Sequence, residues 1–285
     1  MSYLEPSEFV TKMVDQGEAK VYMSTKDTLI RAFMAGAILA LAAVFAITVA
    51  TQTGSALAGA MLFPVGFIML YLMKFDLLTG VFTLVPLALL DKRPGVTPNQ
   101  VLRNWGLVFA GNFAGALSVA FMVSFILTYG YNTDGGALAA KVSSIGESRT
   151  LGYAAHGMEG WLTIFIRGML CNWMVSMGVV GAMVSTSATG KMAAMWMPIM
   201  LFFYMGFEHS IVNMFLFPFS MIMGGEFTFM QYIIWNELPT ALGNLVGGLV
   251  FVGLPLYYTH VRTNPERILK NKAAPVVKPT APVNP

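Results

Sequence analysis

The sequence predicts an all-α integral membrane protein with six transmembrane helices. Three observations carry this prediction: 56% of its 285 residues are hydrophobic, only 11% are charged, and the mean hydropathy is +0.66. An average soluble domain has about 25% charged residues, and it lacks repeated apolar runs of about 20 residues. The composition therefore excludes an ordinary soluble domain.

Counting one span for each apolar run of about 20 residues gives six spans. In chain order they cover residues 28–50, 58–90, 105–129, 161–184, 192–223 and 241–258. The second and fifth runs are too long for simple spans, and polar residues interrupt them at 76–80 and 206–210. Non-helical backbone at membrane depth is tolerated only where it is buried in protein or lines a cavity. Each of these runs is therefore expected to form two half-helices joined by an irregular turn.

The segments between the spans predict the topology. Residues 1–27 mix acidic and basic side chains without the apolar core of a signal peptide, so they are expected to remain as a cytoplasmic N-terminal segment. Basic residues follow the second, fourth and sixth spans, whereas the long loop 130–160 and the turn before the sixth span carry few. The positive-inside rule then places both termini in the cytoplasm, around a transmembrane domain at 28–260 in the cell (inner or plasma) membrane. The tail 261–285, rich in Pro and Val, is predicted to be a disordered cytoplasmic extension.

The inventory of reactive side chains is small. Cys171 is the only cysteine, which excludes an intramolecular disulfide and a Cys/His metal site of the usual spacing. Three histidines, at 156, 209 and 260, are a poor set for a membrane-embedded enzyme. No enzymatic activity, metal or cofactor is expected. Topology accounts for the net charge of +3, so nucleic acid is not an expected partner.

A short pattern occurs twice, once after each interrupted span. Gly111-Asn112-x-x-Gly115 lies in the third span and Gly243-Asn244-x-x-Gly247 in the sixth. With three spans in each half, the second half enters the membrane from the opposite side, which gives an inverted repeat whose discontinuous helices meet near the midplane. The alternative is that small residues here only let helices pack closely.

The two interruptions place polar and ionisable groups near the middle of apolar segments. Such groups are costly in hydrocarbon unless they face a bundle interior or a cavity, so their presence indicates a functional site. Paired interruptions favour a transport pathway.

Three segments resemble the signatures of the formate/nitrite transporter family. They are residues 206–214 (GFEHSIVNM), 167–175 (RGMLCNWMV) and 76–79 (DLLT). The resemblance implies an aquaporin-like protomer with an inverted 3+3 repeat and broken helices two and five. It further implies a homopentamer with one channel in each subunit, around a central axis that holds membrane lipid. The substrates it implies are small monovalent anions, with formate first and nitrite or hydrosulfide as alternatives.

The resemblance places His209 at the pore centre and Asn172 close to the pore. Thr79 is the natural counterpart from the other half, because a hydroxyl both donates and accepts hydrogen bonds. In an apolar segment, burial of a neutral imidazole at His209 costs less free energy than burial of an imidazolium. The N-termini of two half-helices that point at the midplane favour an anion there without a full cationic charge.

Three further polar residues are expected to support this site. Asp76 is predicted to cap a half-helix that begins at Leu77. Glu208 is expected to fix the tautomer of His209 or to satisfy the second break. Asn213 is expected to tie the broken helix to its neighbours.

Four apolar residues match positions that resemble the two hydrophobic constrictions of the family: Phe63, Phe67, Leu77 and Phe202. A narrow dry ring makes a bare anion expensive and a neutral acid cheap. The substrate then crosses either as the anion or as the neutral acid, after protonation in the vestibule or near His209. A proton-coupled secondary transporter of small carboxylates remains an alternative. A water or glycerol pore is disfavoured, since the Asn-Pro-Ala pair of such pores is missing.

One position departs from the family. A lysine common in its members aligns with His156, which is cationic only in mildly acid conditions. Anion capture in the vestibule is then expected to depend on pH. The alternative is that Lys141, Arg149 or Arg167 supplies the attraction instead.

Overall fold

The structure, a computed structural model, describes residues 3–263 and is built of helices there, without a strand. The disorder predicted for the tail concerns residues that lie, from 264 onward, outside the described range. In chain order the helices are α1 Pro6–Tyr22, α2 Thr25–Thr53, α3 Ala56–Leu62, α4 Pro64–Leu72, α5 Leu78–Leu90, α6 Pro98–Leu127, α7 Gly136–Ser148, α8 Leu151–Ala154, α9 Gly157–Val184, α10 Ala188–Tyr204, α11 Ser210–Ile222, α12 Phe229–Tyr232, α13 Leu238–Gly248 and α14 Leu254–Tyr257. Three π-helical segments interrupt the last part: η1 Ile233–Glu237, η2 Leu249–Gly253 and η3 Tyr258–Arg262.

Four of the described helices are long and apolar enough to cross a membrane: α2, α6, α9 and the continuous helix Phe229–Arg262. Shorter apolar helices cover Ala56–Leu72, Leu78–Leu90 and Ser210–Ile222. The helical path stops after α4 and after α10 and resumes at α5 and α11. The helices are therefore interrupted close to both predicted positions.

One predicted boundary is wrong: the last long helix begins at Phe229 rather than at residue 241. The predicted loop 130–160 lies between α6 and α9 and contains the shorter helices α7 and α8. A capping box between Thr228 and Gln231 starts the last long helix. Glu237 in the third turn of this helix is charged, which is typical of a loop residue, but it is only 3% exposed. Burial with hydrogen-bond partners is what permits a carboxyl group inside an apolar helix.

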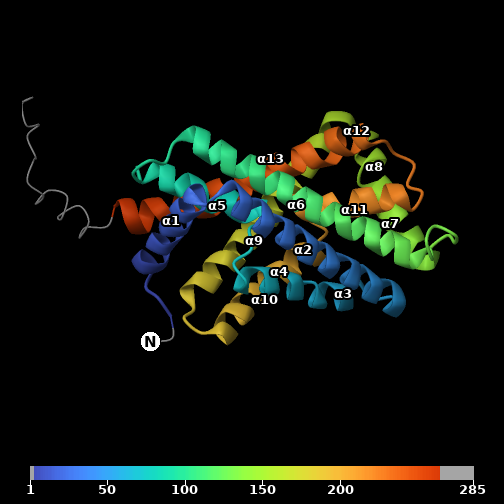
Figure 1. The fold of residues 1–285 in the computed structure, drawn as a ribbon, viewed down its shortest axis with the longest axis horizontal. Coiled ribbons are helices and arrows are strands. Elements are labelled where there is room, and N and C mark those ends of the chain that lie inside the picture. The colour runs from blue at the N-terminus through green and yellow to red at the C-terminus, as the bar shows by residue number, and fades with distance from the viewer. Residues whose placement is uncertain (1–2, 264–285) are drawn as a thin grey trace, which may run out of the picture.

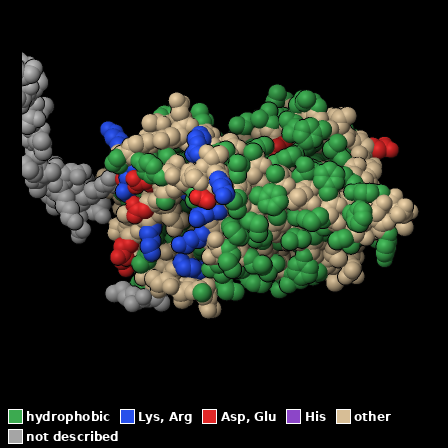
Figure 2. Space-filling model, in the orientation of Figure 1, with side chains coloured by type: hydrophobic (Ala, Val, Ile, Leu, Met, Phe, Trp, Pro, Cys, Tyr) green, Lys and Arg blue, Asp and Glu red, His purple; other side chains and the backbone are tan. Residues whose placement is uncertain are grey.

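The long helices run side by side along the longest axis of the molecule, with α1 at one end and α7 at the other (Figure 1). We call these the α1 end and the α7 end. Lys, Arg, Asp and Glu gather at the α1 end, whereas the rest of the face in Figure 2 is mostly hydrophobic. Large apolar side chains such as Phe45 on α2 and Phe121 and Phe125 on α6 are exposed. This distribution is that of a protein embedded in a membrane with a charged end in water.

The half-helices α5 and α11 form the centre of the molecule. Most residues of both half-helices are buried, and a helix that is apolar on all sides is typical of a core. The aromatic side chains Phe215, Phe217 and Phe219 of α11 are fully buried. The two breaks therefore lie inside the protein, as non-helical backbone at membrane depth requires.

Glycines bring two pairs of long helices into backbone contact. The pairs α2 with α6 and α9 with α13 make the most extensive contacts in the fold. A Cβ atom at Gly115 of α6 would lie 2.0 Å from the carbonyl oxygen of Phe33, and one at Gly243 would lie 2.2 Å from that of Phe165. Both values are far inside van der Waals contact, so only glycine allows these approaches.

Gly115→Ala is expected to destabilise the protein, because the added methyl group meets backbone that cannot yield. Gly106→Ala on the same helix is the matched control, since nothing lies within 4 Å of a Cβ atom there. The control should gain up to about 1 kcal/mol of helix propensity. Thermal unfolding in detergent measures both variants. Equal or higher stability of Gly115→Ala would show that α2 and α6 are not in backbone contact.

Candidate functional site

Asn112 on α6 closes the first break. Its Oδ1 accepts a hydrogen bond from the backbone N–H of Leu78, the first residue of α5, at 2.9 Å. Its Nδ2 donates to the carbonyl oxygens of Ala32 on α2, at 2.8 Å, and of Asp76 in the break, at 2.9 Å. One buried amide thus links the break to the two long helices beside it.

Asn244 on α13 makes the same three bonds at the second break. Its Oδ1 accepts from the N–H of Ser210, the first residue of α11, at 3.0 Å. Its Nδ2 donates to the carbonyl oxygens of Gly168 on α9, at 2.8 Å, and of Glu208 in the break, at 2.9 Å. The repeated Gly-Asn-x-x-Gly pattern marks these two residues in the sequence, but it does not reveal their hydrogen-bonding role.

The two breaks bring Thr79 and His209 together. Thr79 is in the first turn of α5 and His209 is the N-cap of α11; both are buried. The Thr79 Oγ1 and His209 Nε2 atoms lie 3.5 Å apart, at the outer limit of a hydrogen bond. Neither atom has another hydrogen-bond partner among residues 3–263. Both atoms are therefore able to form a further hydrogen bond with a small bound molecule.

The cap fixes the tautomer of His209. Nδ1 accepts a hydrogen bond from the N–H of Val212, at 3.4 Å, so in the neutral imidazole the hydrogen is on Nε2. The N–H donor of the ring thus faces Thr79. Glu208 does not set this tautomer, contrary to the first of its two expected roles, because its carboxylate turns toward other partners.

Asn172 on α9 contacts the backbone of Thr79. Its Nδ2 donates to the carbonyl oxygens of Thr79, at 3.1 Å, and of Asn244, at 2.6 Å. Its Oδ1 accepts from Ser176 at 3.3 Å. The amide of Asn172 is thus used to hold α5 and α13 together next to the His209–Thr79 pair.

Aromatic rings cover the imidazole on one side. Phe202 of α10 stacks on His209 with ring centroids 5.5 Å apart, and Phe63 packs edge-on against Phe202 at 5.7 Å. Phe67 and Leu77, the other two predicted constriction residues, instead line a cavity at the α1 end. Phe63 and Phe202 thus belong to the aromatic cluster at His209, whereas Phe67 and Leu77 lie in the wall of this cavity.

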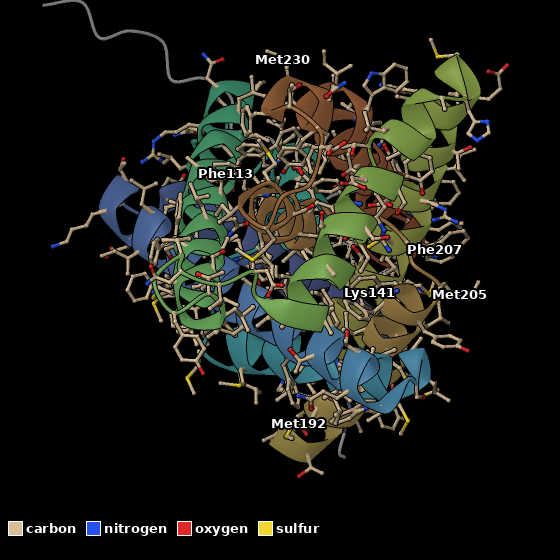
Figure 3. The ribbon with its side chains drawn as sticks, turned by 90° about the vertical axis from the view of Figure 1, so that its right-hand side faces the viewer. Phe113, Lys141, Met192, Met205, Phe207 and Met230 are labelled. Carbon is tan, nitrogen blue, oxygen red and sulfur yellow. The ribbon has the colours of Figure 1, made fainter. Side chains whose placement is uncertain are left out.

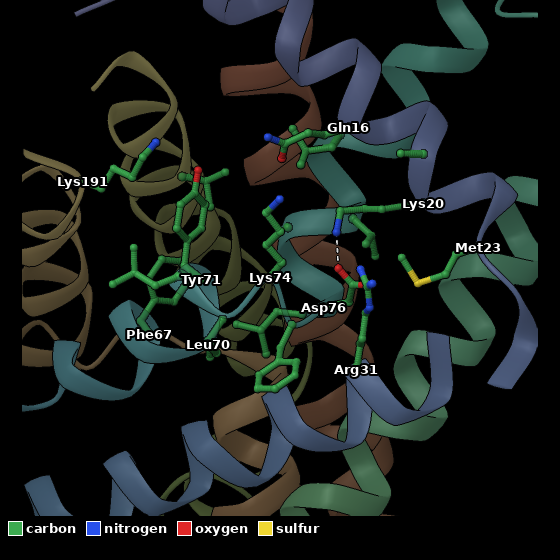
Figure 4. Close-up of a pocket in the computed structure, with 18 residues that line it drawn as sticks. Gln16, Lys20, Met23, Arg31, Phe67, Leu70, Tyr71, Lys74, Asp76 and Lys191 are labelled. Carbon is green, nitrogen blue, oxygen red and sulfur yellow. Dashed lines mark hydrogen bonds and ion pairs between the residues drawn. The ribbon is translucent and has the colours of Figure 1, made fainter. Parts of the chain in front are cut away.

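That cavity is about 430 Å³ in volume and lies between α1, α2, α4, α5 and α10 (Figure 4). Four basic side chains line it, from Lys20, Arg31, Lys74 and Lys191, against the single carboxylate of Asp76. Figure 4 shows the ion pair between Lys20 and Asp76. The excess of basic groups gives the cavity a positive potential.

Asp76 is not the N-cap of a half-helix, so that prediction is wrong. The cap position is Leu77, and α5 begins one residue later than expected, at Leu78. Asn112 takes the N–H at the start of α5, and the Asp76 side chain points to Lys20 of α1. An aspartate two residues before a helix no longer has the cap geometry.

At the α7 end, Glu208 is the hub of a polar network. Its carboxylate accepts from Asn213 at 3.0 Å and from Asn236 at 3.4 Å, and Arg149 lies 3.6 Å from it. Asn213 also donates to Asn236, at 2.6 Å, so it joins α11 to the last long helix. This end faces the viewer in Figure 3, where the labelled Met205 and Phe207 mark the second break.

Tyr153 extends this network toward solvent. Its hydroxyl donates to Glu208 at 3.4 Å and accepts from Arg167 at 2.9 Å. Burial, and then the charge of Glu208, raise the pKa of Tyr153, so the phenol stays protonated. His156 is exposed at the start of α9 and makes no ion pair among the described residues. Of the four basic candidates for this vestibule, two reach the break: Arg149 pairs with the carboxylate of Glu208, and Arg167 donates to the carbonyl oxygen of Gly206 at 3.4 Å.

Replacing either asparagine with leucine should show how much its amide contributes to the stability of the protein. Asn244→Leu removes the side-chain partner of the Ser210 N–H and of the Glu208 carbonyl oxygen in the break, at a cost of about 1–3 kcal/mol for each buried group. We expect a large fall in the melting temperature in detergent and an equal fall for Asn112→Leu. The exposed Asn132→Leu is the control. Stable variants at positions 112 and 244 would contradict this role.

Buried polar groups at two helix breaks, enclosed in an apolar helical bundle, define a membrane transport protein. Among the described residues no group of three or more His, Cys, Asp or Glu side chains is placed to hold a metal ion.

Comparison with known proteins specifies the family. The model of the family "Formate/nitrite transporter" matches residues 7–258. A probable formate transporter of Methanothermobacter thermautotrophicus is 31% identical over 276 residues, which cover 92% of this chain and 98% of the relative. An FNT family ion channel of known structure matches with a TM-score of 0.77 at 23% identity, over 88% of this chain and 98% of that one. A pentameric formate channel with formate bound matches with a TM-score of 0.67 at 25% identity, over 82% and 96%. The chain belongs to the formate/nitrite transporter family, and the resemblance seen in its motifs is confirmed.

Proposed function

We propose that the protein is a channel for small monovalent anions, with formate as the first substrate and nitrite or hydrosulfide as alternatives. One observation carries the proposal. The His209–Thr79 pair lies where the two half-helices begin, with unused hydrogen-bonding capacity, among apolar residues. The formate transporter and formate channel named among its relatives support this choice.

The proposed architecture is a six-span, aquaporin-like inverted repeat. Two facts support it: each half contains a broken helix, and Asn112 and Asn244 make equivalent bonds at the two breaks. We assign a channel domain to residues 28–260, with the N-terminal segment 1–27 and the tail 261–285 in the cytoplasm. The gathering of basic side chains at the α1 end supports this orientation in the cell membrane.

The proposed assembly is a homopentamer with a pore in each subunit. The pentameric formate channel among the structural relatives supports it. Exposed apolar side chains on α2 and α6, such as Leu41 and Ile126, supply surface for subunit contacts and for lipid.

The two half-helices provide the attraction for an anion at the centre. A helix N-terminus carries about half a positive charge and free N–H groups, so α5 and α11 together favour a negative guest beside His209. Phe63 and Phe202 on one side and Phe67 and Leu77 on the other would exclude ions that keep their water. The cationic cavity collects anions from the α1 end.

His209 acts as a hydrogen-bond donor in this proposal, not as the source of a proton. Its single ring hydrogen is on Nε2, and a neutral imidazole cannot give that hydrogen away as a proton near neutral pH. Charging the ring at Nδ1 would break the cap bond from Val212. A substrate that crosses as the neutral acid therefore takes its proton from the vestibule. Proton-coupled transport by alternating access is distinguished by saturation of the flux.

His209→Ala should lower formate flux by at least about tenfold, because a hydrogen bond to a charged group is worth about 1.5–3 kcal/mol. Proteoliposomes in formate, nitrite, hydrosulfide, lactate and glycerol measure the flux. His260→Ala, at the end of the last helix, is the matched control. Glycerol-only flux, or equal formate flux in both variants, would overturn the proposal.

Arg149 is proposed as the vestibule cation at the α7 end, in place of His156. Arg149→Gln should reduce uptake at low formate concentration and Arg149→Lys should restore it, since only the charge is needed for attraction. His156→Ala and His156→Lys should both keep the pH profile of the unchanged protein. A profile that differs between the two His156 variants would assign the role to His156 after all. Size-exclusion chromatography checks assembly of each variant.

A further inference from the structure

Glu237 is a buried acid that the proposed pathway does not use. It ends the π-helical segment η1 and is 3% exposed. Ser210, the first residue of α11, donates its hydroxyl to Oε1, and Tyr232 donates its hydroxyl to Oε2 at 2.8 Å. The carboxyl group is thus held one side chain from the half-helix that His209 caps.

Its surroundings differ from those of the other two buried acids. Asp76 is paired with Lys20, and Glu208 lies 3.6 Å from Arg149. Glu237 has no cation within 4 Å among residues 3–263. An ionised carboxylate without a counter-ion is very costly in an apolar interior, whereas the neutral acid is tolerated with the same hydroxyl partners.

Glu237 lies where its charge acts on the N-terminus of α11. The N-terminus of α11 carries a partial positive charge of about half a unit. An ionised Glu237, bonded to the hydroxyl of the first residue of that helix, more than cancels this charge. The neutral acid leaves it in place. Glu237 lies in a π-helical segment, a form that is rare overall and frequent at functional sites, and its side chain reaches Ser210.

We propose that Glu237 is a proton-binding site that controls anion passage. With the proton bound, the centre of the molecule keeps the positive potential of α11 and anions pass. Loss of the proton to solvent leaves a negative carboxylate there, and anion flux falls. The inference rests on the proposed anion channel function, and its ligand is the proton alone.

The titratable and charged groups on the elements packed around η1 do not supply the missing cation. Arg149 is paired with Glu208, and Arg167 donates to the hydroxyl of Tyr153. Glu208 adds a like charge, which opposes ionisation of Glu237. The groups on these elements are Tyr232 on α12, Glu208 in the break, His209 at the N-terminus of α11, Tyr153 on α8, Glu159, Arg167 and Cys171 on α9, and Arg149 between α7 and α8.

The test compares Glu237→Gln with the exposed control Glu226→Gln in proteoliposomes, at equal pH on both sides. Glutamine keeps the shape and never ionises; like the neutral acid, it accepts from one hydroxyl group and donates to the oxygen of the other. The ratio of Glu237→Gln flux to that of the unchanged protein should rise several-fold from acid to alkaline pH, and that of the control should stay constant. Taking ratios removes the pH dependence of the substrate itself. A constant ratio for Glu237→Gln overturns the proposal.

Two further measurements keep the test decisive. Infrared difference spectra on changing pH should show a titrating carboxylic C=O band that Glu237→Gln lacks; its absence from the unchanged protein overturns the proposal, even if no anion is transported. Tyr232→Phe removes one donor to the ionised form, so the fall in flux should move to higher pH. If the flux of Tyr232→Phe falls at the same pH as that of the unchanged protein, the proposed role of Glu237 is contradicted. Absence of formate and nitrite flux in the unchanged protein would instead reject the channel function, and the infrared band would still decide whether Glu237 binds a proton.

Discussion

The rest of the structure depends on how two helix breaks are satisfied inside an apolar bundle. A backbone N–H or carbonyl group without a partner is expensive at membrane depth, and each break is closed by one asparagine that makes three bonds. The amide reaches the break because glycines bring α6 against α2 and α13 against α9. Each half of the protein thus combines a close, glycine-mediated helix contact with an asparagine that closes the break.

The closures decide where the half-helices begin, and so where Thr79 and His209 lie. Because α5 starts at Leu78 and α11 at Ser210, Thr79 and His209 come within 3.5 Å of each other. Both helix N-termini then act on the same small volume. In the proposed channel, an anion at the centre then needs no fixed cation beside it.

Acidic residues at the breaks connect this centre to both ends of the molecule. Asp76 is held by Lys20 from α1, and Glu208 by Arg149 from the segment between α7 and α8. Elements outside the long helices are therefore attached to the breaks by charge. Glu237 stands apart, since hydroxyl groups alone hold it, which is why its proton matters in our proposal.

The sequence by itself determined the class of protein, both breaks, the family and the positions of His209 and Thr79 in the chain. Composition and run length are sufficient for the class, because the bilayer imposes them on any spanning helix. Tertiary structure decided the partners: Asn112 rather than Asp76 at the start of α5, Arg149 rather than His156 beside Glu208, and two hydroxyl groups around Glu237. It also extended the last helix back to Phe229 through a segment with a buried acid. A hydrogen-bond partner depends on which atoms packing brings within about 3 Å, and residues far apart in the chain supply those atoms.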